Sequence, residues 1–168
     1  MARVSEAVDV ERLIRSSGNF TLHFICPDPH SYAMTDETFT ISTEGTHTVT
    51  RTHGSADSAP VYYLRAQTTN RPNSYVDITT NNIRLRVGDG VLVASQELVI
   101  DASLVTAKVV NASTGETIRN GMHLLKNIGF PVLRKGGNTV QVQVSPLANS
   151  STPASFTELR IQARNRWR

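Results

Sequence analysis

Short segments in which apolar and polar residues alternate recur along most of this chain, and they limit its fold more than any other feature. Residues 83–87 alternate Ile, Leu and Val with two arginines, the pattern of a strand with one buried and one exposed face. Residues 37–43, 74–80, 138–144 and 157–167 have the same period of two. A chain built from such segments is predicted to form antiparallel β-sheets, because each strand needs a core on only one side.

Turn-forming residues separate the predicted strands. The connectors 53–60, 68–73 and 146–155 are rich in Gly, Pro, Asn, Asp and Ser. Many short strands with connectors of this kind predict an antiparallel β-sandwich or a closed roll. Residues 91–101 are more continuously apolar, which predicts a strand covered on both sides, and residues 107–121 predict a hairpin.

The N-terminal residues follow a different period. Apolar residues fall at helical spacing between Val4 and Ser17, and Gly18 is a good stop signal. This stretch is therefore predicted to be the only helix, and a strand at residues 20–25 follows it. The Cys-Pro-Asp-Pro run comes next, and its two prolines interrupt pairing.

That proline-containing run is the predicted domain boundary. Residues 1–27 are expected to form a separate piece, a helix plus a strand. Residues 28–168 are expected to form the sandwich domain.

The net charge of the chain comes from its C-terminus. Seventeen basic and 14 acidic residues give a formal net charge of +3, and without the four arginines at positions 160, 164, 166 and 168 it would be −1. Proteins that bind nucleic acids usually spread Lys and Arg over a face and interleave aromatic residues. Because neither pattern occurs, no nucleic-acid binding is predicted.

Two further classes of protein are excluded. The single cysteine, Cys26, rules out a disulfide within the chain. No apolar run approaches the about 18 residues that a membrane span needs. No apolar core follows the first residues, so we expect the chain to fold in a cytoplasm.

The residues that carry catalysis in other proteins are not arranged for it here. There is no G-x-S-x-G segment, and Cys26 precedes a proline, which is not the setting of a reactive thiolate. Asp36 and Glu37 lie in a polar turn, where we expect them to be solvated. The histidines lack the spacing of metal ligands and are His23, His30, His47, His53 and His123. We predict no enzyme activity, no metal and no cofactor.

Residues 130–144 contain the most suggestive loop. Phosphate-binding loops place glycines between a strand and a helix, whereas Gly136, Gly137 and Asn138 precede an alternating strand. The segment is therefore predicted to be a turn whose glycines allow positive φ and which Asn138 closes.

Carbohydrate binding or host adhesion is the alternative function that the residues leave open. A sugar site needs an exposed aromatic platform beside polar side chains. Trp167 lies in the terminal arginine run, which is a poor setting, and packing on strand faces suits Tyr62, Tyr63 and Tyr75 better. An exposed aromatic residue in a groove on the concave sheet would favour this alternative.

Arg160, Arg164 and Arg166, together with Trp167, form a candidate protein interface. Their even spacing puts the arginines on one face of a strand. Like charges stacked side by side are unfavourable. We therefore expect either open solvent or acidic groups of a neighbouring chain around them.

Three motifs, in their order along the chain, resemble those of the siphophage distal tail protein family and of related tail components in prophages. The family's D-P-x-x-Y junction is matched by Asp28, Pro29 and Tyr32. Its late P-x-L-x-x-G-x-N-T turn is matched by Pro131, Leu133, Gly136, Asn138 and Thr139. Its closing Arg-aromatic pair is matched by Arg166 and Trp167. The resemblance extends from Ile14 to Arg168.

The resemblance implies a structural, non-enzymatic role at the tip of a phage tail. Such proteins form hexameric rings through an N-terminal domain, and a galectin-like, jelly-roll-like β-sandwich projects outward. The implied partners are other copies of the chain, the tail tube protein, the tail-tip hub protein and, in some phages, a receptor-binding protein. The implied location is the virion tail tip, and the host cytoplasm during assembly.

A full-length member of that family carries about one domain of strands before the helix. We therefore expect this chain to be either the C-terminal portion of a longer product or a shortened variant. In either case the resemblance implies that residues 1–27 are a remnant or the end of the ring-forming N-terminal domain.

Overall fold

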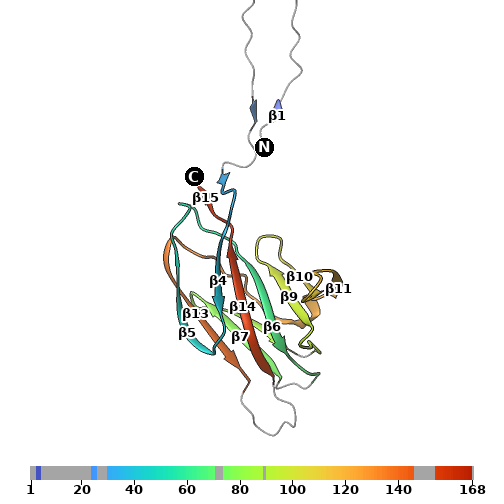
Figure 1. Ribbon diagram of the computed structural model, residues 1–168. Helices are drawn as coiled ribbons and strands as arrows, with labels where there is room; N and C mark the ends of the chain where they lie inside the picture. Colours follow the sequence, from blue (N-terminus) through green and yellow to red (C-terminus); the bar gives the residue numbers. More distant parts are fainter. Residues whose placement is uncertain are drawn as a thin grey trace, which may run out of the picture.

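The computed structural model describes residues 3–4, 24–25, 30–70, 74–88, 90–145 and 154–167, and their fold is made of strands (Figure 1). Every strand pairing among these residues is antiparallel. Their only helical segment is the 3-10 turn Met122–Leu124. The prediction of an all-β, antiparallel fold is confirmed.

The larger sheet has six strands in the order β11-β10-β9-β6-β14-β4. Their bounds are Glu37–Ile41 for β4, Val61–Gln67 for β6, Gln96–Asp101 for β9, Thr106–Asn111 for β10, Thr117–Asn120 for β11 and Ser155–Ala163 for β14. The longest of these strands, β14, lies between β4 and β6 and pairs with both along most of its length.

The second sheet has five strands in the order β12-β8-β7-β13-β5. Their bounds are Gly45–Arg51 for β5, Tyr75–Thr80 for β7, Ile83–Gly88 for β8, Leu125–Ile128 for β12 and Gly136–Val144 for β13. Two short sheets complete the described strands: β3 (Ser31–Tyr32) pairs with β15 (Arg166–Trp167), and β1 (Arg3–Val4) pairs with β2 (Phe24–Ile25).

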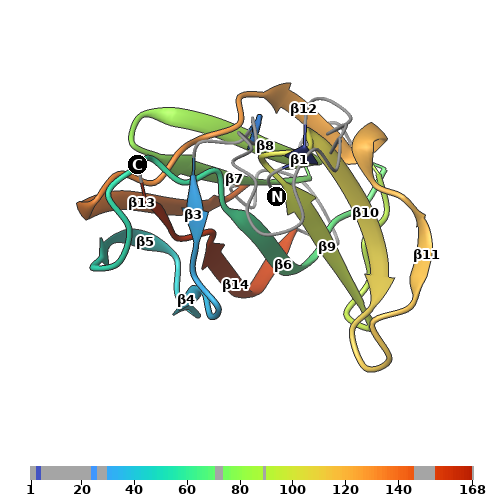
Figure 2. The same ribbon diagram turned by 90° about the horizontal axis from the view of Figure 1, so that it is seen from above.

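The two large sheets face each other across one core (Figure 2). Tyr62 and Leu64 of β6 and Val140 and Val142 of β13 point into it, and all four are 0% exposed. The intervening residues point to the outer faces, because side chains alternate along a strand. Full burial of such aliphatic side chains contributes about 1.5–3 kcal/mol each. The result is a sandwich-like arrangement held by the alternation that the sequence displays.

Strand β9 is covered on both sides, as its continuous apolar run predicts. Leu98 and Ile100 are 0% exposed in the main core. On the opposite face Val99 packs with Val61 and Val110 in a second, smaller cluster. This second cluster makes the outer face of the six-stranded sheet partly apolar beside its charged residues.

The prediction for the N-terminal residues is wrong where the structure describes them. Val4, the predicted start of the helix, belongs to β1 and pairs with Phe24 in β2. Residues 5–17 of the predicted helix lie outside the described residues, as does the predicted boundary between residues 27 and 28. Of the strand predicted at 20–25, the described part is β2.

Candidate functional site

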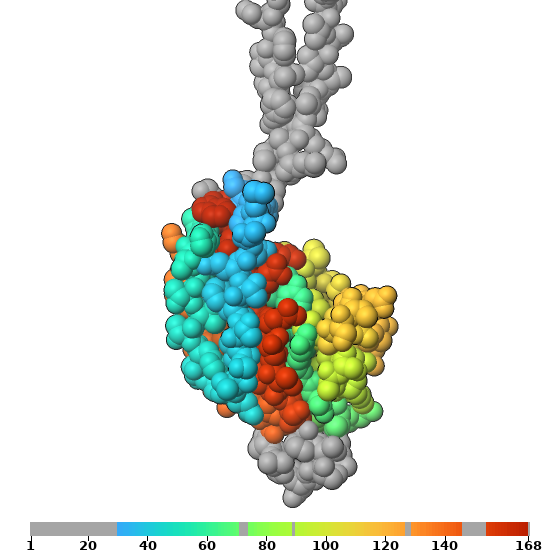
Figure 3. All heavy atoms as spheres, in the orientation of Figure 1, coloured from blue at the N-terminus to red at the C-terminus, as the bar shows by residue number. Residues whose placement is uncertain are grey.

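Arg160 of β14 and Arg164, the residue that follows this strand, lie on the outer face of the six-stranded sheet, which Figure 3 displays. Nη2 of Arg160 lies 2.7 Å from Oε1 of Glu97, and Nη2 of Arg164 forms an ion pair with Asp101. Both acidic residues belong to β9 of the same chain, whereas the sequence had led us to expect either open solvent or the acidic groups of a neighbouring chain. The hydrogen bond from Arg160 to Glu97 is the main reason that the pKa of Arg160 is raised.

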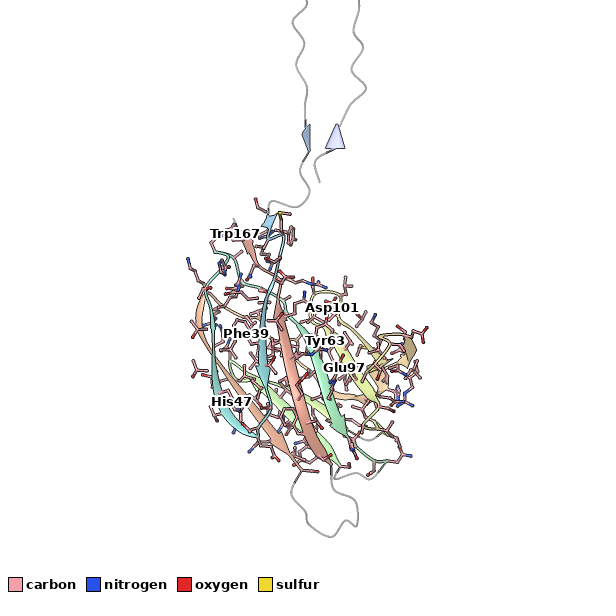
Figure 4. All side chains as sticks on the ribbon, viewed as in Figure 1. Phe39, His47, Tyr63, Glu97, Asp101 and Trp167 are labelled. Carbon is pink, nitrogen blue, oxygen red and sulfur yellow. The ribbon has the colours of Figure 1, made fainter. Side chains whose placement is uncertain are left out.

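The same face carries a wider polar network (Figure 4). The hydroxyl group of Tyr63 donates to Oε1 of Gln162 at 2.9 Å, and the guanidinium of Arg160 lies 5.0 Å from the centre of the Tyr63 ring. Nε2 of Gln162 in turn donates to Asp36 at 3.2 Å. Glu97 also forms an ion pair with Arg65 at 3.2 Å. The network joins β6, β9 and β14 to the residue that precedes β4, and its carboxylates compensate the positive charge of the arginines.

Arg166 and Trp167 lie in a different place, at one end of the two large sheets. Strand β15 pairs with β3 in the register Arg166 to Tyr32 and Trp167 to Ser31. Nε of Arg166 donates to the carbonyl oxygen of Asp57 at 2.7 Å. The four candidate interface residues therefore form two groups, one on the sheet face and one at this end.

A buried arginine ties this end together. Arg51, the last residue of β5, is 0% exposed. Its Nε donates to Oδ1 of Asn165 at 2.9 Å, and its Nη1 donates to the carbonyl oxygens of Ala56 at 2.8 Å and Leu133 at 3.1 Å. Burial lowers the pKa of Arg51 from its ordinary value. No carboxylate within the described residues forms an ion pair with this guanidinium. Carbonyl and amide oxygens accept from its Nε and Nη1, and its buried Nη2 has no hydrogen-bond partner among the described residues.

Gly54 covers the guanidinium of Arg51. A Cβ atom at this position would lie 2.3 Å from Nη2 of Arg51 and 2.8 Å from the carbonyl oxygen of Arg166. The residue also has a φ of +83°, in the left-handed region. Both features require glycine here.

Trp167 lines a surface pocket of about 300 Å³ at the same end. The other lining residues are Ala33, Met34, Thr35, Asp36, Glu37 and His53. Trp167 is 37% exposed and Met34 is fully exposed. From the sequence, Trp167 is poorly placed for a sugar site, but its indole borders this pocket together with Asp36 and Glu37.

Asp36 and Glu37 accept hydrogen bonds from the protein, whereas the sequence had led us to expect that solvent surrounds them. Oε1 of Glu37 accepts the backbone N–H of Thr52 at 3.0 Å, and Oε2 accepts that of His53 at 3.2 Å. Burial alone would raise the pKa of Glu37, but hydrogen bonds from Thr52 and His53 outweigh it and lower the pKa to about 2. Asp36 accepts the backbone N–H of Asn165 at 3.0 Å.

The late turn is confirmed as a turn that starts a strand. Asn138 is 1% exposed, and its Oδ1 accepts the backbone N–H of Arg134 and a side-chain N–H of Asn81, both at 2.8 Å. Its Nδ2 donates to the carbonyl oxygens of Arg134 and Gly136, both at 2.9 Å. Gly136 has a φ of +90°. Both ends of the Asn138 side chain are thus used to close the loop.

The other residues of the tail-protein motifs fall into three groups. Pro131 and Leu133 are buried and Thr139 is exposed, all close to the turn. Tyr32 lies in β3 and is 55% exposed. Asp28 and Pro29 lie outside the described residues.

The three tyrosines considered for sugar binding lie on strand faces. Tyr62 is buried, donates to Thr80 at 3.1 Å, and has a pKa that burial raises. Tyr63 belongs to the network above. Tyr75 stacks under Arg86, whose guanidinium lies 3.7 Å from the ring centre. Within the described part of the chain, no group of three or more His, Cys, Asp or Glu is placed to hold a metal ion.

Sequence reasoning missed Arg51, Asn165 and the buried Glu97. Arg51 precedes a polar loop and Asn165 lies between two arginines, so a pattern of hydrophobicity assigns both residues to the surface. Glu97 lies within an apolar run, which is the one available signal that its face is covered.

Comparisons with known proteins found no match. No protein-family model matches the chain, and neither a curated protein nor a solved structure does. None of the helices in the described ranges is long and apolar enough to cross a membrane.

Proposed function

We propose that this chain is a structural, non-enzymatic component of a phage or prophage tail tip, similar to siphophage distal tail proteins. In this role it connects the tail tube to the tip or baseplate hub. Its partners are other copies of itself in a hexameric ring, the tube protein, the hub protein and, in some phages, a receptor-binding protein. It acts in the virion tail and assembles in the host cytoplasm.

One observation carries the proposal: the three sequence motifs of the resemblance meet at one end of the fold. Tyr32 of the first motif pairs with Arg166 of the last. The carbonyl oxygen of Leu133, from the second motif, accepts a hydrogen bond from Arg51. Arg51 also binds Asn165, the residue before the last motif. Described residues from motifs that lie far apart in the sequence, at positions 32, 133 and 166, therefore serve one local structure, which explains why the motifs would occur together.

The fold is compatible with this role. Six-stranded and five-stranded antiparallel sheets around a shared core are what a galectin-like sandwich would provide. The motif residues that are described act as structural elements, and their side chains close a turn or pair two strands. A module whose buried polar groups form hydrogen bonds within its own fold suits a virion component better than an enzyme.

Carbohydrate binding remains the second candidate because of Trp167. Its exposed indole borders a pocket, which is the kind of feature that a sugar site needs. This candidate ranks lower because the pocket lies at one end of the two sheets, whereas a sugar site was expected in a groove on the concave sheet. The carboxylates that line it already accept hydrogen bonds from the protein.

Light scattering on the purified chain over a range of concentrations tests the proposal. A ring would give a discrete species of about 110 kDa, six copies of 18.4 kDa, with ring-shaped particles in negative-stain micrographs. A monomer at every concentration would contradict ring formation by this chain.

A further inference from the structure

We propose that the pocket beside Trp167 binds a cationic side chain, the guanidinium of an arginine or the ammonium of a lysine, carried by a partner protein. The inference goes beyond the tail-tip proposal and does not depend on it. It rests on the chemistry of the two walls of the pocket, on its size and on the residue that holds both walls in place.

The first wall is aromatic and apolar. It consists of Ala33, Met34 and Trp167. The indole is 37% exposed, and Met34 extends fully into solvent. The face of an indole carries negative electrostatic potential and attracts a cation that lies within about 6 Å. Tryptophan and methionine are also enriched in the central parts of protein interfaces.

The second wall is anionic. It contains Asp36 and Glu37. Their hydrogen-bond donors are backbone N–H groups, the hydroxyl group of Thr52 and the amide of Gln162, together with the His53 ring at 3.0 Å from Glu37. Neutral donors hold a carboxylate in its ionised form without cancelling its charge. The pKa of Glu37, lowered to about 2, agrees with this.

No lysine or arginine of the described residues lines the pocket, and the basic residue in its lining is His53, whose Nδ1 lies 3.0 Å from Oε1 of Glu37. Two nearby arginines of the described chain are engaged elsewhere, since Arg51 is buried and donates to three oxygens, and Arg166 donates to the carbonyl oxygen of Asp57. Two carboxylates and an indole around one hollow, with no described lysine or arginine among its lining residues, are complementary to an incoming guanidinium or ammonium group.

The size and shape of the pocket favour one side chain over a sugar chain. A volume of about 300 Å³ is at the lower limit of small-molecule sites, about 300–1,000 Å³. A sugar ring would need donors as well as acceptors around its hydroxyl groups. Apart from Thr35, His53 and the indole N–H of Trp167, the polar side-chain groups of the lining are carboxylates.

Asn165 places both walls, so the pocket is formed before anything binds. Its backbone N–H donates to Asp36 at 3.0 Å, and its carbonyl oxygen accepts the N–H of Ala33 at 2.9 Å. Its side chain is fixed by Arg51. A preformed pocket loses little conformational entropy on binding, which favours even a single-residue ligand.

The only tryptophan of the chain provides the measurement. N-acetyl-arginine-N-methylamide is titrated into the full chain while the fluorescence of Trp167 is recorded, with the corresponding citrulline compound as the uncharged control of the same shape. We expect a saturable change with the arginine compound and a response at least about five-fold weaker with citrulline. Methyl glycosides titrated in the same way test the sugar alternative.

Two variants locate the effect. Asp36→Asn removes one charge from the pocket and should weaken the arginine response about three- to five-fold, which is the range of a partly exposed ion pair. Glu116→Gln makes the same change of net charge in the exposed turn between β10 and β11, and it should leave the response unchanged. If Asp36→Asn lowers stability, the unaltered chain still decides through the comparison of arginine with citrulline.

Three results would overturn the inference. The first is the absence of a saturable fluorescence change with the arginine compound. The second is an equal response to citrulline, which would show that the charge plays no part. The third is saturation by a glycoside together with no response to arginine, which would assign the pocket to a sugar.

Discussion

The guanidinium of Arg51 and the side chain of Asn165, 114 positions apart in the sequence, are joined by a hydrogen bond of 2.9 Å that is buried at one end of the two sheets. Through this contact the last strand of the chain is attached to β5. The same guanidinium holds the carbonyl oxygens of Ala56 and Leu133. Two loops, those that contain Ala56 and Leu133, and the C-terminal residues around Asn165 thus depend on one side chain.

Arg51→Met should therefore be among the most destabilising substitutions in the described part of the chain. It leaves the oxygens of Asn165 and Ala56 without their donor, whereas the carbonyl oxygen of Leu133 keeps the backbone N–H of Ser58 at 2.9 Å. A buried unsatisfied group costs about 1–3 kcal/mol. We expect a loss of about 2–4 kcal/mol in the free energy of unfolding, measured by urea denaturation. Arg134→Met, at an exposed position of the late turn, is the control and should change it by less than about 0.5 kcal/mol. Equal effects of the two substitutions would show that the buried contacts contribute little.

Gly54 and Gly115 separate backbone strain from steric collision. Both have positive φ, +83° and +74°, but a Cβ at Gly115 has no atom within 4 Å, whereas at Gly54 it lies 2.3 Å from Arg51. Gly115→Ala should cost about 1–2 kcal/mol from strain alone. Gly54→Ala should cost about 1–3 kcal/mol more, because the guanidinium must move. The comparison is made by thermal and urea unfolding, and Gly54→Ala being no worse than Gly115→Ala would refute the tight packing over Arg51.

Asn138→Ala should open the late turn. It removes two acceptor contacts, from Arg134 and Asn81, and two donor contacts, to Arg134 and Gly136. We expect a loss of about 2–4 kcal/mol, with faster amide hydrogen exchange at residues 134–138. Thr139→Ala, the exposed neighbour, serves as the control. Slow exchange in this turn after Asn138→Ala would contradict the structural role of the side chain.

Glu37 should make the fold sensitive to acid. Its pKa in the folded protein is about 2, below the ordinary 4.5, so its contribution is present above about pH 5 and is lost as the pH falls towards 2. Solvent screens this carboxylate, so the contribution is about 1–2 kcal/mol and not the full value of the shift. In urea unfolding, Glu37→Gln should be less stable than the unaltered chain at pH 6, and the difference should shrink by pH 3. Glu116→Gln should show no such convergence, and parallel pH profiles for Glu37→Gln and the unaltered chain would remove Glu37 as the cause.

The alternating strands could be predicted from the sequence because one face of each is apolar, as in β8 and β13. Strands β5 and β6 were missed for opposite reasons. In β6 both Tyr62 and Tyr63 have partners, so its two faces look alike. In β5 the position near the end that points inward is an arginine, which the period of two assigns to the surface.

The contacts that organise the candidate site could not be predicted. The pairing of Arg160 with Glu97 and of Arg51 with Asn165 depends on strand order, and β6 had to be placed between β9 and β14 first. For the C-terminal arginines the sequence left open both solvent and the acidic groups of a neighbouring chain, because nothing in it places residues 97 and 101 beside residues 160 and 164. Long-range register is set by the whole sheet and not by any one strand.

The central claim, that this chain belongs to a phage tail tip, is tested most directly by immunogold electron microscopy. Antibodies raised against the purified chain are applied to particles released after prophage induction or infection in the organism that encodes it. We predict gold particles at the distal end of the tails, at the junction of tube and tip. Intact tailed particles that carry no label at the tip, while the chain is found free of particles in the same lysate, would contradict the claim.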